Sequence, residues 1–278
     1  MNISMTTDYL ADEGDPSPYL RRIAETGFTH VHWCHHWNTD FLYARCEVDQ
    51  VARWLSEYGL RLLNVHGSNG REKCWYAPEA YRREAGIELV RNRLEMAARL
   101  GGDVVIMHAV LDPSEDVSSF WDALFRSLDA LQPEARSLGV RIAVENLNDP
   151  GHWDIVVRIL DAYPPDYVGL CYDSGHGNKK DDGLSHLERL QDRLIAVHLH
   201  DNNGLADQHL IPFTGTLDWD RLAGVLARSA YSAPVNIETM MHQTGLTDEG
   251  DFLVRTYVAA VRLDGLIGRL ASLSPAAT

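Results

Sequence analysis

The sequence predicts a single (β/α)₈ barrel, on three observations. Short apolar runs rich in β-favouring residues alternate eight times with longer amphipathic stretches along the 278 residues. The apolar runs lack polar alternation, which is typical of parallel strands buried on both faces. Gly59, Gly101 and Gly139 each close an amphipathic stretch, as glycine does at the end of a helix. Eight such strand–helix units form a parallel sheet that closes into a barrel with its helices outside.

Strands are expected where Val, Ile, Leu and aromatic residues cluster in short runs. The first run, NISMTT, lies close to the N-terminus, and the last, APVNIET, precedes the final amphipathic stretch. The expected strands are residues 2–7, 28–33, 61–67, 103–109, 141–146, 167–173, 194–201 and 233–239.

Helices are expected after each strand, where apolar positions recur at 3.6-residue spacing. This period is clearest over residues 78–100. The barrel is expected to span residues 1–271, with a flexible tail at 272–278. The expected helices are residues 18–26, 48–58, 78–100, 120–138, 153–162, 184–190, 219–230 and 247–270.

An open doubly wound sheet is the structural alternative to the barrel. Such a sheet calls for a glycine-rich phosphate fingerprint or a crevice at a switch point in the strand order. No GxGxxG motif follows a strand in this sequence, so the barrel is preferred.

Composition indicates a cytoplasmic protein that acts on a small molecule. No apolar run approaches the roughly 20 residues that span a bilayer, and the N-terminus lacks the pattern of a secretory signal. Four cysteines without CxxC spacing favour a reducing compartment. The net charge of −15 argues against broad nucleic-acid binding. A homo-oligomer is compatible with these features.

Nine potential metal ligands lie at or just beyond the C-terminal ends of the apolar runs. Functional groups of such barrels gather at this end of the strands, so we expect the nine to converge. Imidazole and carboxylate together suit zinc, manganese, iron or cobalt better than thiolate-seeking metals. The nine are His66, His108, Glu145, Asp173, His176, His198, Asp207, His209 and Glu238.

Glu145 and Glu238 carry the strongest indication of a metal site. Each follows an apolar run, IAV or VNI, and has no Lys or Arg beside it in sequence. Burying an unpaired carboxylate costs several kcal/mol, so each should meet a partner or a cation. We predict metal ligation by Glu145, Asp173, His198 and Glu238. A lone histidine at a strand end is more often an ordinary hydrogen-bonded residue.

The motifs VEN, CYDSGH, HLHDNNGLADQHLIPFTGTLDW and NIET resemble those of the xylose-isomerase-like TIM-barrel superfamily, over nearly the whole chain. The superfamily includes sugar-phosphate isomerases and epimerases, inosose dehydratases and the endonuclease IV branch. In the isomerase branch the resemblance implies one divalent ion, of manganese, magnesium, cobalt or zinc, held by the four residues predicted above. In the endonuclease IV branch it implies three zinc ions, with five further ligands: His66, His108, His176, Asp207 and His209.

The loops favour the isomerase branch. PFTGTLDW resembles the PGxGxxDW segment of sugar isomerases, with Phe213 where the first glycine usually stands. The glycine-rich extension that the endonuclease branch carries after the strand 5 glutamate is absent, and so is its LGEG. Basic residues interleaved with aromatics, which DNA-binding loops need, occur only at residues 71–76.

One departure concerns the sugar substrate. Ketohexose 3-epimerases of the superfamily carry Glu and Arg where this chain has Gly151 and Gly204. The difference argues against epimerisation of free ketohexoses, but not against metal-assisted proton transfer.

The predicted function is that of a divalent-metal-dependent isomerase or epimerase of a sugar, sugar phosphate or keto-polyol. The metal would polarise the substrate carbonyl, and Glu145 and Glu238 would exchange the proton at the adjacent carbon. His176 would hydrogen-bond a substrate oxygen. The alternatives are a keto-cyclitol or keto-sugar dehydratase or lyase, a trinuclear zinc phosphodiesterase, and a metal-binding protein without catalysis. Further substrate contacts are expected from Trp33, His35 and Lys73.

Overall fold

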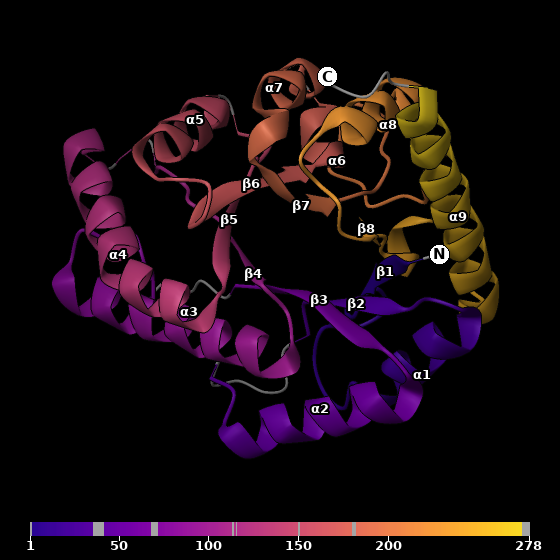
Figure 1. The fold of residues 1–278 in the computed structure, drawn as a ribbon, viewed down its shortest axis with the longest axis horizontal. Coiled ribbons are helices and arrows are strands. Elements are labelled where there is room, and N and C mark those ends of the chain that lie inside the picture. The colour runs from indigo at the N-terminus through magenta and orange to yellow at the C-terminus, as the bar shows by residue number, and fades with distance from the viewer. Residues whose placement is uncertain are drawn as a thin grey trace.

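The structure is a computed structural model that describes residues 2–35, 42–67, 72–112, 114, 116–149, 151–179 and 182–273. Eight parallel strands form one sheet in which each strand pairs with its neighbour in sequence and β1 also pairs with β8. A bridge between Leu199 and Ile237 joins the β7 and β8 ends. Figure 1 shows the strands in the centre with helices around them, which confirms the predicted (β/α)₈ barrel. The strands are β1 (Ile3–Thr6), β2 (His30–Trp33), β3 (Arg61–His66), β4 (Val104–Met107), β5 (Arg141–Glu145), β6 (Val168–Asp173), β7 (Leu194–His198) and β8 (Val235–Ile237).

Apart from the short helix α6, which the sequence pattern did not predict, the described helices agree with that pattern except at their ends. Gly59, Gly101 and Gly139 adopt left-handed backbone conformations immediately after α2, α3 and α4, as expected. The last helix continues through Leu273, and residues 274–278 of the expected tail lie outside the described residues. The helices are α1 (Ser17–Thr26), α2 (Arg45–Tyr58), α3 (Ala80–Leu100), α4 (Val117–Leu138), α5 (His152–Ala162), α6 (Ser174–Gly177), α7 (Gly183–Leu190), α8 (Trp219–Arg228) and α9 (Glu249–Leu273), with the 3₁₀ turns η1 (Gln191–Arg193) and η2 (Met241–Gln243).

Helix α2 begins at Arg45, three residues before the expected start. The Glu47 side chain turns back to accept a hydrogen bond of 2.6 Å from the Ala44 backbone N–H. Such a bond pairs a backbone donor that would otherwise lack a partner at the start of a helix, so it extends the helix beyond its apolar stripe. No described helix is both long and apolar enough to cross a membrane.

The barrel interior has an apolar side and a polar side. A small apolar cluster, separate from the main core, is formed by residues of β4 to β7. On β8, β1, β2 and β3 the alternating positions are Asn236, Ser4, His32 and Asn64, all at most 2% exposed. Ser4 and Asn236 are register partners, and so are His32 and Asn64. This polar side lies next to the candidate metal ligands at the C-terminal ends of the strands.

Gly86 of α3 allows the helix to pack against the segment that follows β3. A Cβ atom there would come within 2.2 Å of the Trp75 backbone nitrogen. We expect Gly86→Ala to lower the free energy of unfolding by about 1–3 kcal/mol, the usual cost of overpacking. Gly268→Ala is the control, because a Cβ at Gly268 of α9 meets nothing within 4 Å. Urea denaturation of both variants tests this, and equal stabilities would contradict the packing argument.

Candidate metal centre

Glu145, the last residue of β5, lies at the centre of the site and is 2% exposed. Its Oε2 lies 3.1 Å from His108 Nε2, 3.1 Å from His198 Nδ1 and 4.0 Å from His66 Nε2. Its Oε1 lies 3.3 Å from His176 Nδ1. One carboxylate from β5 thus meets histidines from four other strand ends, as the convergence argument anticipated.

Asp173 ends β6, and His176 lies on the short helix α6 that follows it. Asp173 is the N-cap of this helix and accepts a 2.7 Å hydrogen bond from the His176 backbone N–H. His176 Nδ1 donates to the Asn146 carbonyl oxygen at 2.9 Å, and its Nε2 lies 3.2 Å from Asp207 Oδ2. The loop after β7 therefore reaches the β6 end through Asp207, which could not be inferred from spacing alone.

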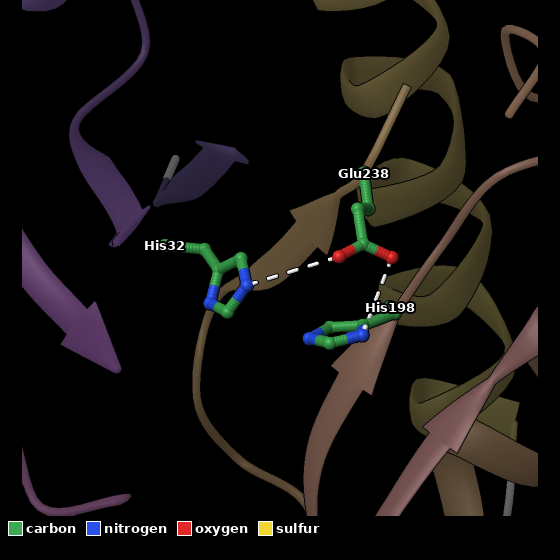
Figure 2. Close-up of side chains that lie close together, drawn as sticks. All are labelled: His32, His198 and Glu238. Atoms are coloured by element: carbon green, nitrogen blue, oxygen red, sulfur yellow. Dashed lines mark ion pairs between the residues drawn. The ribbon is translucent and has the colours of Figure 1, made fainter. Parts of the chain in front are cut away.

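Glu238 follows β8 and closes the other side of the site. Its Oε2 lies 3.2 Å from His198 Nδ1, and its Oε1 lies 3.8 Å from His32 Nε2 (Figure 2). Its backbone carbonyl accepts a 2.9 Å hydrogen bond from His209 Nδ1. All nine expected ligands therefore contact at least one other member of the set, so the predicted convergence is confirmed.

His200 also belongs to the site, although the sequence pattern did not single it out. Its Nε2 lies 3.0 and 3.1 Å from the two oxygens of Asp173, and its ring stacks on His209 at 3.9 Å. The motif HLHD could have indicated this role, because side chains two residues apart on an extended chain face the same way. His198 and His200 both follow that rule and both end in the site.

Most ring tautomers in the site are set by backbone carbonyls. His66, His176, His200 and His209 each bond a carbonyl oxygen through Nδ1, at 2.8–2.9 Å. In His66 and His209, whose pKa burial lowers, the proton then sits on Nδ1 and the lone pair on Nε2, which is how metal-binding histidines are usually held. These imidazoles are therefore pre-arranged to present Nε2 to a cation.

Among the described residues, the three buried carboxylates have no lysine or arginine partner. Within the described part of the chain, every ion pair of Glu145, Asp173 and Glu238 is with a histidine. Burial and the charges of Glu145 and Asp173 raise the pKa of Glu238 well above its usual value. A divalent cation would supply the positive charge that lets all three ionise together.

The histidines of the site also favour a bound divalent cation. Burial, with neighbouring His108, lowers the pKa of His66 to about 3, so its ring is neutral. Both ring nitrogens of His198 are buried without a hydrogen-bond partner among the described residues. The neutral His66 ring, the buried carboxylates and the unpaired nitrogens of His198 form a donor set that fits a borderline divalent ion such as zinc, manganese or cobalt.

The three expected substrate-binding residues lie outside this cluster of contacts. Trp33 is 1% exposed in the core, and its Nε1 donates to Tyr43 Oη at 2.9 Å. His35 donates from Nε2 to the Gly14 carbonyl at 2.8 Å. Lys73 is partly buried in the segment after β3. Residues 36–41 and 68–71, which include His36, Trp37 and Arg71, lie outside the described residues.

We expect His200→Asn to weaken metal binding by at least about tenfold, whether His200 binds the ion or orients Asp173, since loss of either role has that effect. Asparagine can still reach the Gln208 carbonyl but cannot replace Nε2. Competition with a chromophoric chelator measures the affinity, with His242→Asn, an exposed histidine of η2, as control. Unchanged affinity in His200→Asn would show that its contact with Asp173 plays no part in binding.

Comparison with known proteins identifies the family of the chain. The family model described as xylose isomerase-like TIM barrel matches residues 20–255. The chain belongs to this family. Over 275 residues it is 35% identical to the uncharacterised protein y4fM of Sinorhizobium fredii, covering 89% of this chain and 88% of the relative. It is also 29% identical over 167 residues to the uncharacterised protein MJ1311 of Methanocaldococcus jannaschii, covering 56% of this chain and 57% of the relative.

Solved structures similar to this xylose isomerase-like barrel confirm its fold. A D-tagatose 3-epimerase-like protein has a TM-score of 0.79 at 20% identity, covering 98% of this chain and 99% of that chain. A 3-keto-D-glucoside 4-epimerase from E. coli has a TM-score of 0.73 at 19% identity, covering 94% and 100%. An L-ribulose 3-epimerase has a TM-score of 0.79 at 13% identity and covers both chains fully.

Proposed function

We propose that the protein is a divalent-metal-dependent isomerase or epimerase that moves a proton at a carbon next to the carbonyl of a small sugar or keto-polyol. The observation that carries this proposal is the pair Glu145 and Glu238. Both are buried, come from different strand ends, and lie 3.1 and 3.2 Å from the same His198 nitrogen. The sugar epimerases among the similar structures support the same reaction class.

The ion would be held by Glu145, Asp173 and Glu238 together with His198, and His200 lies in reach of Asp173. When bound, a divalent ion polarises the substrate carbonyl and lowers the pKa of the adjacent C–H. Glu145 and Glu238 then act as base and acid, one removing the proton and the other returning it. His176 donates from Nε2 to a substrate oxygen, which replaces Asp207 as its partner, because Nδ1 already donates to the Asn146 carbonyl.

Two glycines argue against a free ketohexose as the substrate. Gly151 and Gly204 stand where the ketohexose 3-epimerases were expected to carry Glu and Arg, and both have positive φ, at 79° and 76°. Side chains other than glycine rarely adopt this conformation, so these loops are shaped for a different set of contacts. We therefore favour a phosphorylated sugar, a keto-glycoside or a keto-polyol.

The free state of all four cysteines supports a reducing, cytoplasmic location.

Solvent exchange tests the proposed reaction. The metal-loaded protein is incubated in D₂O with a panel of keto-sugars, their phosphates and keto-cyclitols, and the products are followed by NMR and mass spectrometry. An isomerase or epimerase incorporates deuterium at the carbon next to the carbonyl without loss of water. Loss of water would identify the dehydratase or lyase alternative, which uses the same proton abstraction.

The second candidate function is a trinuclear zinc phosphodiesterase. Ligand atoms of His66, His108 and Glu145 lie within 4.8 Å of one another, and so do those of Glu145, Asp173 and His176. More than one ion could therefore be bound. Cleavage of an oligonucleotide containing an abasic site, with no deuterium exchange on any keto-sugar, would favour this function over the isomerase.

A further inference from the structure

His32 is a buried histidine on the polar side of the barrel interior, and the proposed reaction gives it no role. It lies on β2 and is fully buried. Its Nδ1 lies 2.6 Å from Asn64 Oδ1. Because the amide oxygen can only accept, Nδ1 carries the proton and Nε2 carries a free lone pair. That Nε2 has no hydrogen-bond partner among the described residues.

The unpaired nitrogen points at Glu238 and His198. Figure 2 shows the three side chains directed toward one another, with Glu238 between the two rings. His32 Nε2 lies 3.8 Å from Glu238 Oε1, whereas the other oxygen of Glu238 lies 3.2 Å from His198 Nδ1. The rings of His32 and His198 are 4.7 Å apart. One donor atom from each residue lies within 4.8 Å of the other two.

The distances fit an ion better than a direct bond. A separation of 3.8 Å is too long for a hydrogen bond between Nε2 and the carboxylate. Two donor atoms that each lie about 2.1 Å from one zinc ion can be up to about 4.2 Å apart. Leaving Nε2 unpaired would cost about 1–3 kcal/mol, and a water molecule there would not offset the charge of Glu238.

We infer that His32 is a further ligand of the metal ion that His198 and Glu238 bind. The inference rests on the metal dependence of the proposed function and deepens it. Added to Glu145, Asp173, His198 and Glu238, His32 gives the ion three carboxylates and two imidazoles, a mixed oxygen and nitrogen set that suits a borderline divalent ion. With His32 included, the site should prefer Zn²⁺ or Co²⁺ over Mg²⁺, because imidazole is a poor ligand for magnesium.

Two substitutions of His32 separate its two nitrogens. His32→Asn keeps a polar group near the Nδ1 position, which can still pair with Asn64, but removes the Nε2 donor. His32→Gln places an amide oxygen near the Nε2 position. His242→Asn, at an exposed site, is the matched control. Each full-length protein is stripped of metal and titrated with Co²⁺ and Zn²⁺ against a chromophoric chelator. The shifted imidazole N–H resonances of the Co²⁺ form count the histidine ligands.

If His32 is a ligand, His32→Asn weakens binding of both ions by at least about tenfold and removes one shifted resonance. His32→Gln then recovers part of the affinity but still lacks that resonance, so it decides the matter should His32→Asn not fold. Unchanged affinity and an unchanged count in the His32 variants would overturn the inference alone. Failure of the unsubstituted protein to bind either ion would remove the metal dependence of the proposed function as well.

Discussion

Substitution of Glu145 or Glu238 by glutamine should reduce deuterium exchange at the substrate carbon by about 10²–10⁴-fold, the usual contribution of a positioned acid or base. Glutamine keeps the shape of the side chain but cannot take up or release the proton. Both carboxylates are buried in contact with His198, so a water molecule cannot easily reach the substrate and act as the base in their place. NMR detection of exchange on the best substrate of the panel measures the effect.

The two glutamates also bind the proposed ion, so each variant must be assayed at saturating metal with its metal content measured. Glu25→Gln is the control, because that side chain is 67% exposed on α1. Exchange at the normal rate in both metal-loaded variants would refute the assignment of these residues as base and acid. Loss of exchange only where the metal is lost would leave them as ligands alone.

Removal of the metal should destabilise the folded protein markedly. A ligand at 100 times its dissociation constant stabilises the state that binds it by about 2.7 kcal/mol, and a higher metal concentration increases this. For a chain of this size each kcal/mol shifts Tm by roughly 2–4 °C. Calorimetry of the protein with excess Zn²⁺ and with chelator measures the difference. Equal Tm values would contradict a metal site at the barrel mouth.

The destabilisation by chelator should grow as the pH rises. Burial, with Glu145 and Asp173 nearby, raises the pKa of Glu238 in the metal-free fold. A group whose pKa is raised in the folded state stabilises the fold at a pH below its unfolded pKa. This stabilisation of the metal-free fold is lost as the pH rises through the raised folded-state pKa. Metal binding itself strengthens over the same range, because its ligands must lose their protons. The Tm difference should therefore be smallest near pH 5 and larger at pH 8.

The barrel could be predicted from the sequence because each unit carries its own local signals. Apolar runs marked the strands, and Gly59, Gly101 and Gly139 marked helix ends where the structure shows left-handed backbone. The early start of α2 was not predicted because it depends on a hydrogen bond that the Ala44 backbone N–H donates to the Glu47 side chain, which apolar spacing does not report.

The site was only partly predictable. Glu145 and Glu238 stood out because a carboxylate within an apolar run needs a partner. His32 and His200 did not, although each alternates with apolar neighbours that pack outward. Their significance comes from contacts with Glu238 and Asp173, which lie far away in sequence and meet them only when the barrel closes. The roles of Trp33, His35 and Lys73 as substrate contacts stay predictions.

Elemental analysis of the purified protein tests the central claim most directly, because the number of bound ions separates the proposed functions. The isomerase or epimerase account requires about one divalent atom of zinc, cobalt, manganese or magnesium per chain, held by the carboxylates of β5, β6 and β8. About three zinc atoms per chain would mean that all the ligand groups are filled, and would move the phosphodiesterase to first place. Protein that is free of metal, and that takes up none on dialysis against these ions, would contradict both functions.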